Sequence, residues 1–138
     1  MRGARALDYL SGLPAFGAYF LLALALFVAF MAIYVRITPH PEIRLIREGN
    51  VAAAASLGGA SIGFALPLAA AIEYSVSLLD MLLWAAVALV VQLIGFGLVR
   101  LAIRDIGQQI EQGRVAAGVL LGAIAIAVGL LNAASMTY

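Results

Sequence analysis

The sequence contains four long uncharged stretches, and this pattern constrains the fold more than any other feature. They run over residues 9–35, 49–72, 81–99 and 115–138. Since about 20 helical residues cross the hydrocarbon core of a bilayer, each stretch is close to the required length or longer. None of them alternates apolar with polar residues as a barrel strand does. We therefore predict an all-α membrane protein with four transmembrane helices in a single membrane domain over 1–138.

The composition supports a chain whose main solvent is lipid. Of its residues 65% are hydrophobic and only 11% are charged, whereas an ordinary soluble domain carries roughly 25% charged residues. The net charge of +1 gives no sign of nucleic-acid binding, and the absence of cysteine excludes disulfides and thiolate metal sites. The single histidine, His40, lies between two prolines, and we expect a solvated turn residue rather than a ligand or a proton relay. We predict no catalytic constellation, no metal, no cofactor and no enzymatic activity.

The two halves of the chain resemble each other. Segment 49–53 (GNVAA) recurs as 113–117 (GRVAA), and the same spacing pairs Gly58 with Gly122 and Tyr74 with Tyr138. We predict two tandem repeats, the first over about 10–74 and the second over about 75–138. Because each repeat contains two spans, both enter the membrane from the same side and form parallel repeats.

The placement of arginine predicts the orientation. The connections before the second and fourth stretches carry six arginines, and positively charged connections stay in the cytoplasm. Both termini are then periplasmic, although Arg2 and Arg5 favour the opposite orientation. The first stretch is longer than the apolar region of a signal peptide, so we expect it to be retained as a helix. The absence of lysine and the alanine-rich helices indicate a bacterial inner (plasma) membrane protein. The six arginines are Arg36, Arg44, Arg47, Arg100, Arg104 and Arg114.

Both arginine-bearing connections are predicted to contain a short helix. In the first, Thr38 is the expected N-cap, followed by prolines in the first turn, with Ile43 and Ile46 on one face. In the second, three isoleucines at positions 103, 106 and 110 share a face. Each connection ends at a glycine, Gly49 or Gly113, which can adopt a left-handed conformation. These segments either lie on the membrane surface or extend the preceding helix straight into the cytosol.

Small residues at four-residue spacing indicate close helix packing. Such residues let helix backbones approach each other in lipid. Packing within one subunit and packing between subunits are both compatible with the pattern. The predicted helix-packing residues are Gly58, Gly59, Gly63, Gly118, Gly122 and Gly129.

Three further residues form a candidate intramembrane polar site. Pro67 frees a backbone carbonyl near Gly63, Gln92 lies near the middle of the third stretch, and Asn132 aligns next to Pro67 in the repeat. Polar groups at membrane depth can mark a functional site. The alternative is that they only join helices through hydrogen bonds worth on the order of 1 kcal/mol each.

Several segments resemble a known family. They are 49–54 (GNVAAA) through 63–68 (GFALPL), 77–81 (SLLDM) and 129–134 (GLLNAA). The chain is similar in these motifs to the YjfL-type family of small bacterial inner-membrane proteins, which is catalogued as a domain of unknown function. The resemblance implies four helices in duplicated halves and an envelope-maintenance context near phage-shock-like peripheral membrane proteins. It implies no activity and assigns no functional residues.

The sequence favours the first of two functions over the second, because nothing inside the membrane is ionisable and a pore for a bare ion needs more polar lining than this chain offers. The first is a membrane scaffold or accessory protein that recruits an envelope-associated partner, either a cytoplasmic peripheral membrane protein or anionic lipid. The second is a homo-oligomeric pore or permeation unit for small solutes or ions. The partners expected in both cases are the lipid bilayer and a second copy of the chain, with a dimer as the first expectation.

Overall fold

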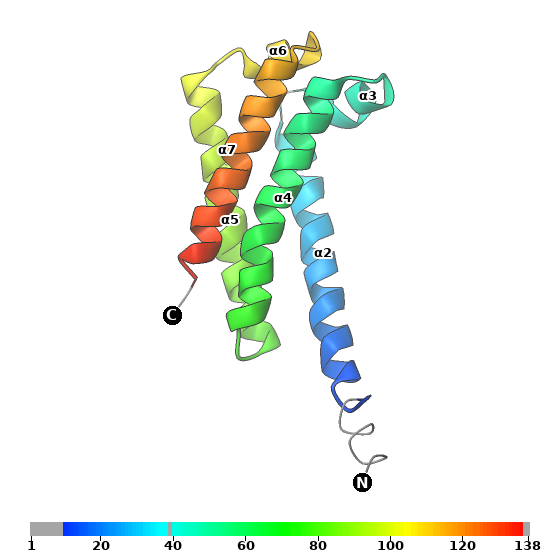
Figure 1. Ribbon diagram of the computed structural model, residues 1–138, viewed down its shortest axis with the longest axis vertical. Coiled ribbons are helices and arrows are strands. Elements are labelled where there is room, and N and C mark those ends of the chain that lie inside the picture. Colours follow the sequence, from blue (N-terminus) through cyan, green and yellow to red (C-terminus); the bar gives the residue numbers. More distant parts are fainter. Residues whose placement is uncertain (1–9, 39, 137–138) are drawn as a thin grey trace.

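The computed structural model describes residues 10–38 and 40–136, and every element within them is helical. The four long helices are α2 (Leu13–Ile37), α4 (Val51–Tyr74), α5 (Leu78–Ala102) and α7 (Val115–Ala134), and each is long and apolar enough to cross a membrane (Figure 1). The two short helices are α3 (Glu42–Arg47) and α6 (Ile106–Glu111). The prediction of an all-α protein with four candidate membrane spans is confirmed.

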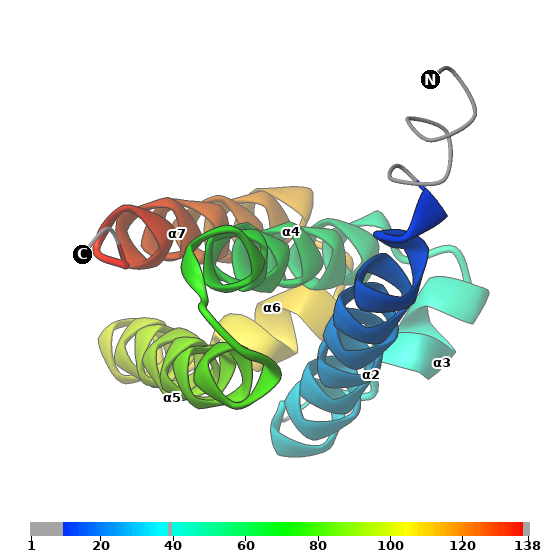
Figure 2. The same ribbon diagram turned by 90° about the horizontal axis from the view of Figure 1, so that it is seen from below.

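Helices α4 and α7 form the centre of the bundle and run in the same direction. Helix α5 packs antiparallel against both of them, whereas α2 packs mainly against α4. The lower part of α2 leads away from the other helices (Figures 1 and 2). Of the most apolar part of each span, 17% is buried in α2 and 50% in α4. Helix α4 is therefore the core helix, and α2 is the most peripheral span.

Ala23 of α2 is buried, although α2 is the most peripheral span. Ala23 is expected to face lipid, but it is only 7% exposed and belongs to the core. Phe30 on α2 stacks on Phe64 of α4 with 4.3 Å between ring centroids. The upper half of α2 is therefore anchored to the bundle even though most of its surface is open.

Glycine and asparagine set the start of the central helices. Gly49 has φ of 86° and Gly113 has φ of 76°, so the left-handed conformation predicted for both is confirmed. The Ala53 amide donates to Asn50 Oδ1 over 2.9 Å, which caps α4. Asn50 Nδ2 also donates to the Ile110 carbonyl over 2.8 Å and ties the start of α4 to α6. The chain can therefore change direction between each short helix and the span that follows it.

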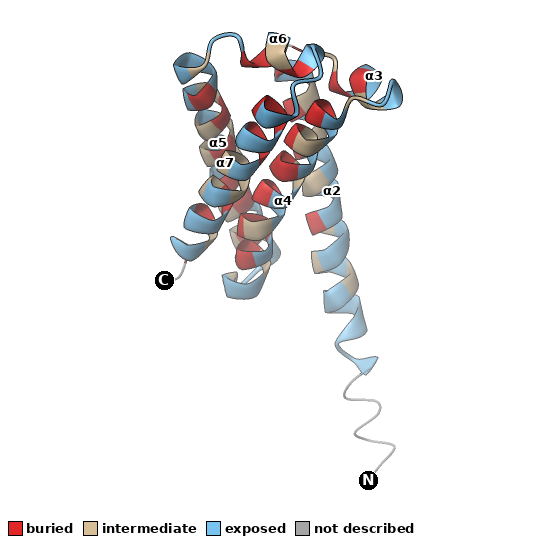
Figure 3. Cartoon of the chain, turned by 45° about the horizontal axis from the view of Figure 1, so that its top comes forward, coloured by how far each residue is buried: buried red, intermediate tan, exposed pale blue. Residues whose placement is uncertain are grey.

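The short helices lie across one end of the bundle, here named the arginine-bearing end. Ile106 and Ile110 of α6 are buried, as the isoleucine spacing predicts (Figure 3). In α3 the predicted face is wrong, because Ile43 is 46% exposed while Glu42 and Leu45 are buried. Neither helix extends the span before it, so that alternative is excluded for both.

The predicted start of α3 is also wrong. Thr38 is the C-cap of α2, and α3 begins after Pro41. Thr38 Oγ1 donates back to the Val35 carbonyl over 3.0 Å, so its hydroxyl serves the preceding helix. Pro39 lies outside the described residues. The chain therefore turns back on itself before α3 starts, which brings α3 over the end of the bundle.

Candidate functional site

Five of the predicted packing glycines lie in the contact between α4 and α7. A Cβ on Gly118 would overlap the Ala52 carbonyl, and a Cβ on Gly59 would overlap the Gly122 backbone. Backbone cannot move aside as a flexible side chain can, so these positions accept only glycine at the observed helix separation. The structure places this packing within one subunit. The glycines of this seam are Gly59, Gly63, Gly118, Gly122 and Gly129.

Gly58 is the exception, because it does not pack against another helix of the same subunit. It is exposed, and a Cβ built on it would meet nothing within 4 Å. Gly58 and Gly59 project about 100° apart on a helix, so only one of them can face α7. Gly58 and Gly122 are therefore not structurally equivalent, although the sequence comparison pairs them.

Pro67 contributes to the same seam without breaking α4. The helix continues through Pro67, which is buried. Since proline has no N–H, the Gly63 carbonyl four residues earlier loses its usual helical donor. This carbonyl oxygen lies against Gly129, where any side chain would overlap it. The freed oxygen is therefore covered by the Gly129 backbone, in the arrangement of a weak Cα–H···O contact.

Gln92 and Asn132 form reciprocal hydrogen bonds between α5 and α7. Gln92 Nε2 donates to the Ala125 carbonyl over 3.2 Å, and Asn132 Nδ2 donates to the Ala88 carbonyl over 3.3 Å. Both amides are buried. These bonds are of the kind that the alternative interpretation, interhelical joining, describes. Gln92 Oε1, however, is buried without a partner, so this amide retains an unused acceptor.

Two cavities lie along the contact between α5 and α7. The first has a volume of about 20 Å³, enough for about one water molecule. The second is an open groove with a volume of about 390 Å³, and Asn132 and Ser135 are among its mostly apolar lining residues. Val128 lines both. The first is lined by Tyr34, Gln92, Gly95, Phe96, Val99, Leu121, Ile124, Ala125 and Val128.

A buried acid–base pair lies beneath α3. His40 Nε2 and Glu42 Oε1 are 2.8 Å apart, and their side chains are 1% and 0% exposed. The prediction of His40 as a solvated turn residue is wrong. The flanking prolines indicate a turn correctly, but they do not reveal that α3 folds back over the bundle and covers this turn. Glu42 was missed, although its spacing of three from Leu45 places both on one face of α3.

Further polar groups surround this pair. Tyr34 of α2 is buried in the same region as Glu42 and Ser56 of α4. Three buried atoms have no hydrogen-bond partner in well-aligned geometry, namely His40 Nδ1, Glu42 Oε2 and Ser56 Oγ. Burial raises the pKa of Glu42, while the hydrogen bond and the charge of His40 act in the opposite direction. The carboxyl group is thereby favoured in its neutral form relative to an exposed glutamate.

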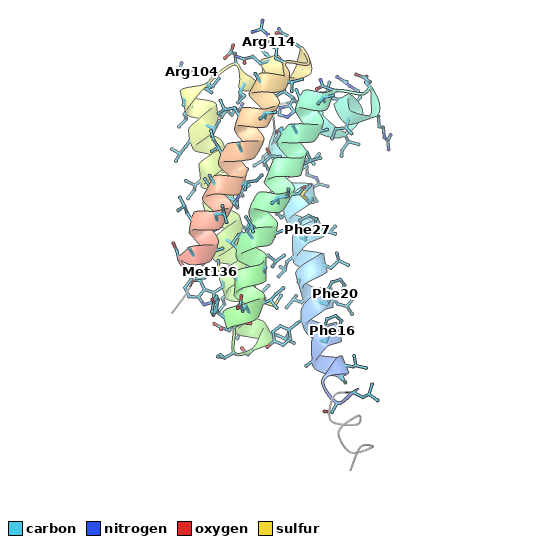
Figure 4. All side chains as sticks on the ribbon, in the orientation of Figure 1. Phe16, Phe20, Phe27, Arg104, Arg114 and Met136 are labelled. Carbon is cyan, nitrogen blue, oxygen red and sulfur yellow. The ribbon has the colours of Figure 1, made fainter. Side chains whose placement is uncertain are left out.

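Exposed arginines surround the two short helices. All six predicted arginines lie at this end and are exposed, and Figure 4 shows Arg104 and Arg114 there. One arginine makes an ion pair, Arg44 with Glu48 at 3.9 Å, and both side chains are largely exposed, so the pair stabilises little. The turn at the opposite end carries Glu73 and Asp80 instead. Within residues 10–38 and 40–136, no three acidic or histidine side chains are grouped so as to hold a metal ion.

Four apolar spans, a glycine seam and a charged end define a polytopic α-helical membrane protein. The model of the family described as Domain of Unknown Function (DUF350) matches residues 8–136. The chain is also 40% identical over 129 residues to "UPF0719 inner membrane protein YjfL" of Escherichia coli strain K12 and of strain O157:H7. Each alignment covers 94% of this chain and 98% of the relative. No solved structure matches.

The chain therefore belongs to the DUF350 family and is an inner-membrane protein. The resemblance inferred from the glycine, proline and asparagine motifs is confirmed. Four of those motif residues, Gly63, Pro67, Gly129 and Asn132, lie in or beside the contacts that α7 makes with α4 and α5.

Proposed function

We propose that this protein is a non-enzymatic membrane scaffold whose arginine-bearing end recruits a peripheral membrane partner with an acidic surface. The observation that carries the proposal is the set of exposed arginines around α3 and α6, all but one of which make no ion pair within the described residues. Such side chains are available to an acidic protein or to anionic lipid headgroups. The positive-inside rule supports an orientation with this end in the cytoplasm and the termini in the periplasm.

The proposed architecture is a pair of tandem parallel repeats that associates as a homodimer. The order of long, short and long helix occurs twice, and a left-handed glycine ends the short helix each time. The pairing surface that we favour is α2, where Phe16 and Phe20 stack on each other at 5.9 Å and remain exposed (Figure 4). Closed two-fold dimers are the commonest symmetric assemblies.

Site-directed photo-crosslinking in intact cells tests the scaffold function. A photoreactive residue replaces Gln108 on the exposed face of α6, and a matched one replaces Val76 in the turn at the opposite end. The expected result is one discrete protein adduct from position 108, which is lost when Arg100 and Arg104 are changed to glutamine. The proposal fails if position 108 gives no adduct, or if the adduct persists in the arginine variant.

A second candidate, a permeation unit for small solutes or ions, is favoured by one specific observation. The two cavities between α5 and α7 share Val128 as a lining residue, so one side chain lies between an inner and an outer space. Flux into liposomes that contain the purified protein tests this candidate. Proteoliposomes that are no more permeable than empty liposomes to every solute tried would exclude it.

A further inference from the structure

Two open depressions at the arginine-bearing end of α5 share the same two arginines. One is an apolar groove of about 700 Å³ along α5, and the other is a polar pocket of about 340 Å³ beside α6. Arg100 and Arg104 line both of them, so the two guanidinium groups lie where the groove meets the pocket. The other lining residues are Ile94, Gly97, Leu98 and Leu101 in the groove, and Gly107, Gln108 and Glu111 in the pocket.

The groove lies on a face of α5 that is open to lipid. Its apolar residues follow the i, i+3, i+4, i+7 spacing of one helix face. Leu98 and Leu101 are 62% and 72% exposed. A Cβ on Gly97 would meet nothing within 4 Å, so the glycine leaves this face hollow at its middle.

The depth of the groove in the membrane follows from the length of α5. The helix has 25 residues and is therefore about 37 Å long, whereas the hydrocarbon core is about 30 Å thick. Its last turn, which carries Arg100, thus reaches the level of the lipid headgroups, and Arg104 follows just beyond it. Ile94 lies about 9 Å deeper along the helix axis. The groove is therefore at the depth of the upper part of an acyl chain.

The charge of the pocket suits a phosphate diester. Neither arginine makes an ion pair within the described residues, and with Glu111 they leave the pocket a net charge of +1. A phosphate diester carries one negative charge, and guanidinium groups bind phosphate oxygens in bidentate geometry. Gln108 and Glu111 can accept hydrogen bonds from hydroxyl groups next to the phosphate. Asp105 is not among the lining residues, and its carboxylate accepts from Gln109 Nε2 over 2.9 Å.

We propose that this site binds one phospholipid with an anionic, hydroxyl-bearing headgroup of the phosphatidylglycerol type. Its phosphate lies between Arg100 and Arg104, its headgroup hydroxyls reach the pocket beside α6, and one acyl chain follows the groove past Gly97. The acidic surface of a protein would neutralise the arginines but would not enter a groove at hydrocarbon depth. The lipid site goes beyond the scaffold function and does not depend on it, because it needs no protein partner.

Native mass spectrometry of the purified protein in mild detergent tests the site, with phosphatidylglycerol or phosphatidylcholine added in increasing amounts. The two lipids share the phosphate diester and the acyl chains, but the second carries a cation in its headgroup. We expect the first phosphatidylglycerol to bind about five-fold or more tightly than phosphatidylcholine. Arg100→Gln combined with Arg104→Gln should abolish this preference. The matched control is Arg44→Gln combined with Arg47→Gln, which removes the same charge from α3, outside both depressions, and should keep the preference.

Equal binding of the two lipids by the wild type would overturn the proposal. An equal loss of preference in the two double variants would also overturn it, because net charge alone would then explain the binding. The experiment contains no other protein, whereas the crosslink at position 108 reports a protein partner. The lipid site and the scaffold function can therefore fail separately.

A second variant tests the groove without a change of charge. Gly97→Leu places a side chain in the groove, and the open space around position 97 should let the protein fold normally, which circular dichroism checks. We expect this variant to bind phosphatidylglycerol several-fold more weakly than the wild type. Its control is Gly58→Leu, at an equally open position on α4, which should bind as the wild type does. Wild-type affinity of folded Gly97→Leu would show that no acyl chain lies in the groove and would overturn the site.

Discussion

Replacement of Gly118 by alanine should destabilise the protein, while the same change at Gly58 should not. A Cβ on Gly118 overlaps the backbone of Ala52, and the helices must separate to make room for it, whereas a Cβ on Gly58 projects into open space. Overpacking of this kind costs about 1–3 kcal/mol. Alanine at Gly58 should instead be neutral or stabilise by up to about 0.5–1 kcal/mol, because glycine loses more backbone entropy on folding. The two variants should therefore differ in unfolding free energy by roughly 1–4 kcal/mol.

Reversible unfolding of the purified protein in mixed micelles with increasing sodium dodecyl sulfate measures this difference. Helical content followed by circular dichroism gives the midpoint, and Gly58→Ala serves as the control for a changed helix propensity. Wild-type stability of Gly118→Ala would refute the reasoning, because the α4–α7 backbones would then not be in contact. Equal destabilisation by both variants would also refute it, since Gly58 would then lie in a packed interface.

Three further predictions concern pH, topology and assembly. Because burial raises the pKa of Glu42 above 4.5, the native state holds this proton more tightly than the unfolded state, and stability should fall as pH rises through and above 4.5. Glu42→Gln should flatten this pH dependence in a series of unfolding midpoints. An unchanged slope in the variant would contradict the prediction. A cysteine at Val76 should react with an impermeant thiol reagent on intact cells, while one at Gln108 should react only after lysis; the reverse pattern would invert the orientation. The protein should have the mass of a dimer in lipid nanodiscs, and Phe16→Ala with Phe20→Ala should weaken the dimer; a monomeric wild type at high concentration would refute this.

The elements of the fold can be predicted from the sequence because lipid imposes a strict rule on charge. Charged residues cluster outside the hydrocarbon core, so the uncharged stretches locate the spans, and each helix differs from its stretch only near the ends. Helix α5, for example, runs over Leu78–Ala102 and includes Asp80 and Arg100. The turns are equally predictable, since Gly49 and Gly113 each follow a short helix and precede an apolar run.

The face that each span turns inward is not predictable in the same way. In a soluble helix, polar residues mark the outer face, but in lipid the outer face is as apolar as the inner one. Gly58 and Gly59 are therefore indistinguishable in the sequence, and so are a buried Ala23 and an exposed alanine. The hydrogen-bond partners of Gln92 and Asn132 cannot be predicted from the sequence for a related reason. Their acceptors are backbone carbonyls, which every residue carries.

The position of Glu42 changes the balance between the two candidate functions. On the sequence, the scaffold is favoured over a pore partly because no ionisable group lies within the uncharged stretches. The fold buries Glu42 and His40 at the arginine-bearing end, and Tyr34 of α2 lines a small cavity inside the bundle. The scaffold uses exposed side chains, such as Arg100 and Arg104, that no span needs for packing, whereas permeation uses buried ones. Arginine variants therefore change an exposed surface, whereas Glu42→Gln changes a buried group. Loss of the position-108 crosslink in the arginine variants, with folded protein unchanged, would support the scaffold.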